Sequence, residues 1–242
     1  MGETDNPVFD ASYAERYDDV FPVYEEASIR VLTELAQGGP VLELGIGTGR
    51  VALPLIDNDL DVYGIDNSEE MLSKLHAKPK GKKVRTHFGD FRNFNIANKF
   101  KLIFCVLNTF FLLLSQEEQL ECFECVSHHL MNGGSFLIEG IVPDLRLFSE
   151  SEFIRPIEIS SRAVKLDVWS HDVVAQRVSG QHIFISDGSI QQFPIEVRYA
   201  WPSELDLMAR VAGLNKKERW GSWAKEPFTA RSRRQICLYQ KD

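Results

Sequence analysis

The sequence has few cysteines, no long hydrophobic run and no excess of positive charge. Its four cysteines stand at positions 105, 122, 125 and 237 of 242 and show no disulfide framework. The longest apolar run, Leu102 to Leu114, is interrupted by Asn108 and Thr109 and is too short to cross a bilayer. The N-terminus has no basic segment followed by an apolar one, so we expect no secretory signal and a cytoplasmic protein.

The charge balance argues against a general nucleic-acid or anionic-membrane surface. The chain has 35 acidic and 27 basic residues, which gives a formal net charge of −8. Polyanions bind proteins through clustered lysine and arginine, so only a local basic patch remains open. The basic run from Lys78 to Arg85 contains Pro79 and Gly81, which mark a loop, and we interpret it as a solvated face. We therefore predict no nucleic-acid partner and no membrane partner.

A glycine-rich turn lies between a predicted strand, residues 41–44, and a predicted helix that starts near Arg50. The turn has the spacing G-x-G-x-G, with its glycines at Gly45, Gly47 and Gly49. Because glycine has no Cβ, the backbone can approach a ligand closely there. The spacing is tighter than the G-x-G-x-x-G of dinucleotide dehydrogenases. Acidic residues stand inside the first strand and at the end of the next one, at Glu43 and Asp66.

The segments ELGIGTG (43–49) and VYGIDNSEEML (62–72) resemble motifs I and II of class I S-adenosylmethionine-dependent methyltransferases. The resemblance implies that S-adenosylmethionine is the cofactor and that Glu43 and the three glycines contribute to its site. It also implies that Asp66 binds the ribose hydroxyls and that Asn67 and Met71 lie beside the adenine. For Met71, simple packing in the core remains an alternative.

Two further segments resemble the same family. Gly89-Asp90-Phe91 follows the third predicted strand and resembles the adenine-contacting motif, in which Asp90 accepts from the exocyclic amine and Phe91 lies against the ring. The fourth strand, Phe100 to Val106, resembles motif IV, although Lys101 stands where most relatives carry Asp. Ligands bind at the carboxyl ends of parallel strands. We therefore predict that Val106 contacts the cofactor and that Asn108 meets the substrate or the methionine part of the cofactor.

The segment ahead of the glycine turn is aromatic and is expected to be helical from Ser12 and again from Tyr24 to Ala36. It resembles the segment that closes over the cofactor in many small-molecule methyltransferases. There a tyrosine near the position of Tyr17 faces the methionine end of the cofactor. Tyr13 can accept a hydrogen bond and is considered beside the candidate bases. Packing of both tyrosines on the sheet remains an alternative.

Helical spacing predicts a helix from Ser115 to Met131, which begins with a capping box and ends at Asn132-Gly-Gly. This helix carries Cys122, Cys125, His128 and His129, but no second cysteine pair completes a tetrahedral zinc site. We therefore predict no metal.

Residues 146–200 change to alternating, strand-like sequence, with Asp187-Gly188 as a hairpin signal. We interpret this segment as an antiparallel lid over the substrate. His182 lies in an alternating strand and is a candidate general base, with a structural role as the alternative. His171-Asp172 is interpreted as a turn. A helix from Pro202 to Leu214 and a final antiparallel pair, residues 216–220 and 235–240, complete the chain.

Together these features predict an α/β fold: a Rossmann-like, doubly wound sheet of seven strands, parallel with one antiparallel strand, and an inserted antiparallel β lid. We expect one domain over residues 1–242, with an N-terminal helical cover at 1–36 and the lid at about 146–200. Methyl transfer to nitrogen or oxygen of a small-molecule metabolite is the expected reaction, with Tyr13, Asn108 and His182 as the catalytic candidates. Lids of this type often mediate dimers, which leaves a homodimer open.

Two other functions remain open. Nucleic-acid methyltransferases of this fold commonly carry (N/D)PPY after the fourth strand, where this chain has Asn108-Thr-Phe-Phe. A catalytically silent protein that binds the cofactor would keep the same glycine turn and acids.

Overall fold

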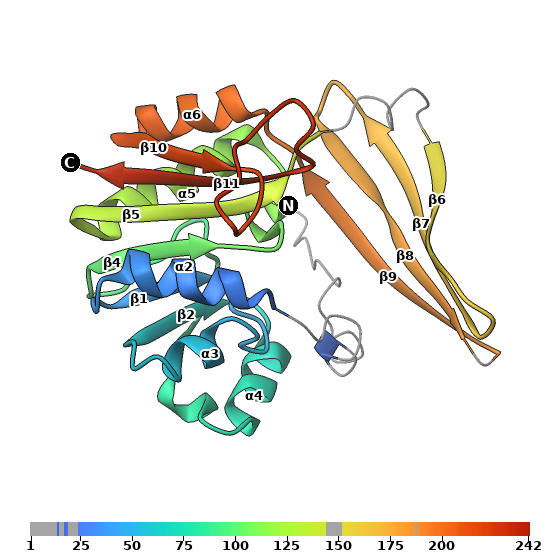
Figure 1. Cartoon of the computed structure of the whole chain (residues 1–242), viewed down its shortest axis with the longest axis horizontal. Coiled ribbons are helices and arrows are strands. Elements are labelled where there is room, and N and C mark those ends of the chain that lie inside the picture. The colour runs from blue at the N-terminus through green and yellow to red at the C-terminus, as the bar shows by residue number, and fades with distance from the viewer. Residues whose placement is uncertain (1–13, 15–16, 19–23, 144–151, 187) are drawn as a thin grey trace, which may run out of the picture.

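The computed structural model describes residues 14, 17–18, 24–143, 152–186 and 188–242 (Figure 1). The large sheet consists of β1 (Val41–Leu44), β2 (Val62–Asp66), β3 (Arg85–Phe88), β4 (Phe100–Cys105), β5 (Leu130–Ile141), β10 (Leu214–Trp220) and β11 (Arg234–Lys241). Its strand order is β10-β11-β5-β4-β1-β2-β3. Strand β11 runs antiparallel to both of its neighbours, and the pairs among β1 to β5 are parallel. The predicted seven-stranded sheet with one antiparallel strand is confirmed.

Helices cover both faces of this sheet. The described helices are α2 (Glu26–Ala36), α3 (Ala52–Ile56), α4 (Glu69–Ala77), α5 (Gln116–His129) and α6 (Pro202–Val211), with short 3₁₀ segments η2 (Gly81–Lys83) and η3 (Thr109–Leu112). Alternate residues of β4 serve the two layers: Leu102 and Phe104 belong to the core beneath α2 and α3, whereas Ile103 and Cys105 belong to the core beneath α5 and α6. Side chains alternate across a strand, so one buried strand supplies both cores.

The predicted capping box at the start of α5 is confirmed, and α4 also begins with a side-chain cap. The Ser68 hydroxyl accepts from the Met71 amide at 3.2 Å at the start of α4. Ser115 and Glu118 form the reciprocal capping box at the start of α5. Each cap satisfies backbone amides that have no partner inside their own helix.

The predicted end of α5 is wrong by two residues. The helix stops at His129, and Leu130 is already extended, buried and paired with Phe100 in β5. Asn132-Gly-Gly therefore lies within β5, where Gly133 has a φ of 69° and the pairing with β4 shifts register. Burial of Leu130 against the neighbouring strand ends the helix before the glycines do.

The inserted segment forms a separate four-stranded antiparallel sheet, which we call the lid. It consists of β6 (Glu152–Ile159), β7 (Ala163–Asp172), β8 (Arg177–Ser186) and β9 (Ser189–Arg198), in that order. In Figure 1, β9 lies nearest the core and β6 lies farthest away. The β8–β9 hairpin closes at the Ser186–Ser189 pair, as the Asp-Gly signal predicts. The turn predicted at His171 is wrong: His171 is a buried residue of β7, and the turn follows Asp172.

A buried polar network anchors the lid to the core. The Arg198 guanidinium, at the end of β9, donates to Gln119 of α5 at 2.7 Å and to Glu204 of α6 at 2.6 Å. Glu204 also accepts from Gln176, and Gln119 donates to the Arg198 carbonyl. Burial raises the pKa of Glu204, but hydrogen bonds from Arg198, Gln176 and Gln116 outweigh it and hold the pKa below its usual value. The network joins one lid strand to two core helices through directional contacts.

None of the helices in the described ranges is long and apolar enough to cross a bilayer. The cytoplasmic location, the single domain with its lid at about 146–200, and the N-terminal cover remain predictions.

Candidate functional site

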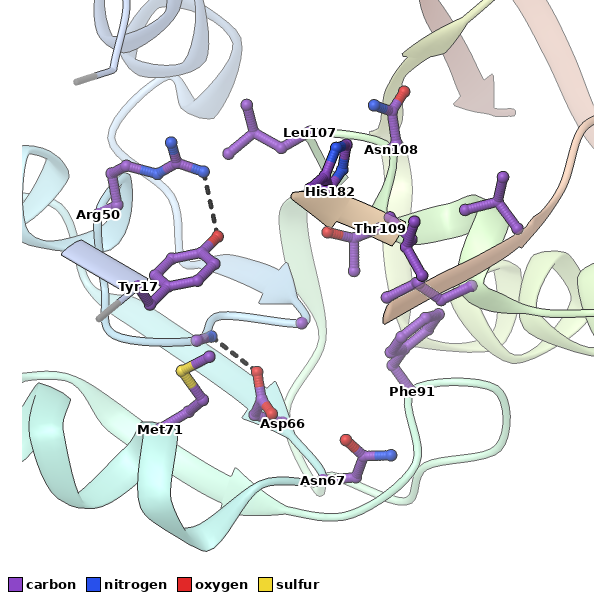
Figure 2. Close-up of a pocket in the computed structure, with 15 residues that line it drawn as sticks. Tyr17, Arg50, Asp66, Asn67, Met71, Phe91, Leu107, Asn108, Thr109 and His182 are labelled. Carbon is purple, nitrogen blue, oxygen red and sulfur yellow. Dashed lines mark hydrogen bonds between the residues drawn. The ribbon is translucent and has the colours of Figure 1, made fainter. Parts of the chain in front are cut away.

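An open cleft lies where the carboxyl ends of β1, β2 and β4 meet the lid (Figure 2). Fifteen residues line it: Tyr17, Gly45, Gly47, Arg50, Asp66, Asn67, Met71, Phe91, Leu107, Asn108, Thr109, Leu112, His182, Ile195 and Val197. This is the edge at which open α/β sheets bind ligands. The cleft has a volume of about 250 Å³ and is open to solvent at its mouth.

The glycine turn is held against β2 by hydrogen bonds from its amides. The amides of Gly45 and Ile46 both donate to the Ile65 carbonyl, at 2.8 and 3.0 Å. The Gly47 amide donates to a carboxylate oxygen of Asp66 at 2.7 Å. Because these donors are already engaged, they do not form a cradle for a phosphate, as the amides of a dinucleotide-binding turn do. The turn therefore offers a ligand close approach to its backbone rather than a set of free amides.

The glycines of the turn differ in the space around them. A Cβ at Gly45 would lie 2.3 Å from a methyl carbon of Thr109, and a Cβ at Gly49 would lie 2.2 Å from a methyl carbon of Leu75. Gly47 has a φ of 54° and nothing within 4 Å of the Cβ position, and it lines the cleft. A side chain at Gly47 would therefore enter the cleft, whereas a Cβ at Gly45 or Gly49 would require the neighbouring side chain to move and would sit on a backbone with positive φ. Gly49 lies outside the residues that line the cleft.

Asp66 lies at the end of β2 and faces the cleft. One carboxylate oxygen accepts from the Gly47 amide and the other from the Ser68 amide, at 2.7 and 2.9 Å. Burial raises the pKa of this carboxyl above its usual value, although the amides of Gly47, Ser68 and Asn67 oppose the shift. An ionised carboxylate has about four acceptor positions, so Asp66 keeps capacity for hydroxyl donors.

Glu43 lies beneath the turn and does not line the cleft. Only 4% of its surface is exposed, and its Oε2 atom has no hydrogen-bond partner among the described residues. Burial raises its pKa well above the usual value; the Arg50 charge and the Ala52 amide oppose this, whereas the Asp66 charge adds to it. Glu43 therefore acts on the cleft only through the turn and through its charge.

Tyr17 and Arg50 meet on one side of the cleft. The Arg50 guanidinium donates to the Tyr17 hydroxyl at 3.1 Å, and its central carbon lies 5.4 Å from the centre of the ring (Figure 2). Burial raises the pKa of Tyr17, and the Arg50 charge opposes that shift. Arg50 was not predicted as a site residue; its place directly after the third glycine was the available signal.

The residues predicted beside the adenine separate into two groups. Asn67, Met71 and Phe91 line the cleft. Asp90 does not: its side chain is exposed, accepts from the Arg92 amide at 2.7 Å and lies 3.6 Å from the Arg92 guanidinium. The loop after β3 therefore presents the aromatic residue of this pair to the cleft and directs the acid toward its own backbone.

The loop after β4 contains two consecutive residues in the left-handed region. Leu107 has a φ of 59° and Asn108 a φ of 67°. The Leu107 amide donates to Glu139 at 3.1 Å, and the Asn108 side-chain oxygen accepts from the Ile141 amide at 2.8 Å. Non-glycine residues persist in this region only where their surroundings hold them, and such positions cluster at functional sites. Leu107, Asn108 and Thr109 all line the cleft.

Val106 lies outside this cleft. It lines a smaller cavity on the α2 side, together with Tyr24, Glu139 and Trp223. The sheet turns its side chain away from the predicted cofactor edge, because side chains alternate between faces at the end of β4.

The lid contributes His182, Ile195 and Val197 to the cleft. His182 Nδ1 lies 2.7 Å from a carboxylate oxygen of Asp167 on β7. Ile195 and Val197 were not predicted, although their spacing of two on β9 places them on one face. His171 bonds to the Tyr199 hydroxyl at 3.0 Å instead and does not reach the cleft.

Two other predictions concern Tyr13 and the cysteine-histidine helix. Tyr13 lies outside the described residues. On α5, His129 Nδ1 lies 2.8 Å from the Cys125 carbonyl, and its Nε2 accepts from the Ile96 amide at 3.3 Å. Within the described ranges, no three metal-ligating side chains come together.

Comparison with known proteins gives one consistent family. Residues 41–134 match the family model described as a methyltransferase domain. The cypemycin N-terminal methyltransferase of a Streptomyces species is 30% identical, over 98% of this chain and 99% of its own length. Among solved structures, the CcbJ methyltransferase of Streptomyces caelestis superposes with a TM-score of 0.86 at 35% identity, over 96% of this chain and 99% of its own. CalS10, an amino pentose methyltransferase of Micromonospora echinaspora solved with S-adenosylmethionine bound, gives a TM-score of 0.72 at 17% identity and so shows the shared fold.

We predict that Glu43→Gln gains stability relative to the natural protein as the pH rises. A carboxyl with a raised folded-state pKa stabilises the fold below its unfolded pKa of about 4.3, and this contribution is lost as the pH rises toward the folded value. The amide has no such loss. Urea unfolding at about pH 5 and about pH 8 measures the difference.

Glu34→Gln is the matched control, because Glu34 is an exposed residue of α2 that pairs with Lys225. For each variant, the free energy of unfolding is compared with that of the natural protein. The raised pKa of Glu43 is refuted if this difference is the same at both pH values for Glu43→Gln, as it should be for Glu34→Gln.

Proposed function

The chain belongs to the S-adenosylmethionine-dependent methyltransferase family, and from this premise we propose that it methylates a nitrogen of a small molecule with an apolar ring or chain beside its amine. The enzyme moves a methyl group from S-adenosylmethionine to a small-molecule acceptor. Nitrogen is favoured over oxygen because the relative that spans the same length is named for methylation of an N-terminus.

The observation that carries the proposal is one cleft with two chemically different sides. Asp66, Gly47 and Met71 come from the core strands and α4, and His182, Ile195 and Val197 come from the lid. The core side offers a carboxylate for paired hydroxyls and a glycine with open space above it. The lid side offers apolar walls and one imidazole. We assign the cofactor to the core side and the acceptor to the lid side.

The residues present fit S-adenosylmethionine. Its adenosine carries two ribose hydroxyls, and Asp66 has spare acceptor positions on a buried carboxylate. S-adenosylmethionine carries no phosphate, which agrees with a turn in which the amides of Gly45, Ile46 and Gly47 already have acceptors on β2. We assign Met71 and Phe91 to the adenine, and Tyr17 and Arg50 to the methionine part. A positive guanidinium suits the cofactor's carboxylate.

The reaction is an in-line displacement that demands little covalent help from the protein. When bound, the cofactor supplies a methyl group activated by a positive sulfur. The cleft has to hold the acceptor nitrogen in line with that methyl group and exclude water. An amine attacks only after it has lost its proton, and we propose that His182 accepts this proton. Asn108 is assigned to acceptor positioning.

A comparison of matched acceptors tests the choice of nitrogen. Benzylamine, N-methylbenzylamine and benzyl alcohol are incubated with the enzyme and S-adenosylmethionine, and release of S-adenosylhomocysteine is measured. We expect turnover with the amines and none with the alcohol above the rate without acceptor. Turnover of the alcohol alone would assign the enzyme to oxygen, and turnover of none of the three would contradict an apolar amine as the acceptor.

Replacement of Asp66 tests the cofactor side. Asp66→Ala removes an acceptor of two ribose hydroxyls, and we expect binding of S-adenosylhomocysteine to weaken by about 2 kcal/mol, roughly thirtyfold. Gly47→Val should abolish binding, because its side chain enters the cleft. Isothermal titration calorimetry measures both.

Asp61→Ala is the control, because Asp61 lies just before the start of β2, is exposed and pairs with Arg85. Its affinity should stay within about twofold of the natural protein. Unchanged affinity in both Asp66→Ala and Gly47→Val would place the cofactor elsewhere.

Replacement of His182 tests the acceptor side. His182→Ala should lower kcat for the amines by about 10²-fold and should remove the fall in rate at low pH, while cofactor affinity changes by less than about threefold. If the variant keeps full activity and the same pH profile, His182 has a structural role and is not the base. Homodimer formation, the absence of nucleic-acid and membrane partners, and the part of Tyr13 remain predictions.

A further inference from the structure

His182 has a hydrogen-bond partner, Asp167, on the neighbouring lid strand. His182 of β8 and Asp167 of β7 are directly paired residues of the antiparallel ladder, so their side chains lie on the same face. The imidazole Nδ1 lies 2.7 Å from Asp167 Oδ1. An ionised carboxylate can only accept, so this contact places the proton of a neutral imidazole on Nδ1.

Asp167 is held as a carboxylate although it is buried. Only 4% of its surface is exposed, and its second oxygen accepts from the Arg155 guanidinium of β6 at 3.1 Å. Burial raises the pKa of Asp167, but the hydrogen bond and charge of His182, together with Trp169 and Arg155, outweigh it and lower the pKa below its usual value. Because both of its carboxylate oxygens are hydrogen-bonded, the buried Asp167 side chain is held in one position on the lid.

The imidazole ring is also held by aromatic contact. The Trp169 ring lies edge-on to His182, with ring centres 5.2 Å apart and planes at 87°. Trp169 pairs with Gly180 across the ladder, where a Cβ would lie 3.0 Å from an indole carbon and 2.0 Å from the Val168 carbonyl oxygen. The absence of a side chain at Gly180 therefore leaves room for the Trp169 indole beside the imidazole.

The other nitrogen of the ring is available. His182 lines the cleft with 28% of its side chain exposed. Its Nε2 atom makes no hydrogen bond within the part of the chain that the structure describes. Asp167 is the titratable group that contacts the ring, Arg155 contacts Asp167, and Tyr17, Arg50 and Asp66 line the same cleft.

We infer that Asp167 is a positioning residue, which fixes the proton of His182 on Nδ1 and leaves Nε2 to take a proton from a protonated amine acceptor. This inference rests on the proposed function. Nε2 accepts a proton from the ammonium group, which gives a neutral amine and an imidazolium that Asp167 balances. The freed electron pair of the nitrogen forms the new bond to the methyl carbon as the carbon–sulfur bond breaks and its electrons stay on sulfur. The imidazolium then releases its proton to solvent.

The proton position is tested directly by ¹⁵N NMR of the imidazole, without any acceptor. In the natural protein at about pH 8, we expect a protonated Nδ1 and an unprotonated Nε2 at His182, and a mixture of both tautomers in Asp167→Asn. A proton on Nε2, or an equal mixture in the natural protein, would overturn the inference whether or not the variant folds.

The functional link is tested by a double-mutant cycle with N-methylbenzylamine as acceptor. Asp167→Asn should lower kcat at least about tenfold, with the KM for S-adenosylmethionine within about threefold, and should cause no further loss in the His182→Ala background. The same loss in both backgrounds would make Asp167 a structural residue and would overturn the inference.

Glu158→Gln is the matched control, because Glu158 is an exposed lid carboxylate paired with Lys165 at 3.0 Å. Its kcat should stay within about twofold of the natural protein. If no amine turns over in the natural protein, the proposed function fails, while the NMR result still decides the position of the proton.

Discussion

The hydrogen bond from the Gly47 amide to Asp66 is the contact on which the cleft depends, because it joins the turn after β1 to the end of β2. It fixes the distance between two parallel strands at the edge where ligands bind. It also consumes the amide that a phosphate would otherwise use and leaves other acceptor positions of the carboxylate open. This one contact therefore joins the two strands that form the core side of the cleft and leaves a carboxylate there with spare acceptor positions.

The parts of the fold predicted correctly are those encoded by neighbouring residues. The glycine turn and the Ser115–Glu118 capping box follow from local spacing, whereas the sheet of seven strands with one antiparallel strand was expected with the help of the family resemblance. The errors come from competition between local and distant contacts. Glycines at 133 and 134 predict a helix stop, yet pairing of Leu130 with Phe100 ends the helix earlier. Asp172 correctly marks a turn, but burial of His171 extends β7 up to it.

The candidate site was predictable only where a motif fixes both the residue and its direction. Asp66 ends a buried strand, so its side chain has to meet the turn. Asp90 and Phe91 are adjacent, and no pattern in the sequence tells which of them the loop turns toward the cleft. The pairing of Asp167 with His182 depends on the register of β7 against β8, which two alternating strands do not define by themselves. The Arg50–Tyr17 contact similarly joins segments that are 33 residues apart.

The position of His182 at the cleft depends on the strand pairing that connects it to Arg198, where the lid is anchored to the core. Arg198 is fixed between Gln119 and Glu204 by buried, charge-assisted hydrogen bonds. It pairs with Arg177 at one end of the β8–β9 ladder, and His182 pairs with Phe193 further along the same ladder. A shift of one residue in this pairing would turn His182 to the opposite face of the lid. The buried network between β9, α5 and α6 therefore also fixes which face of the lid meets the core side of the cleft, and so which lid side chains line it.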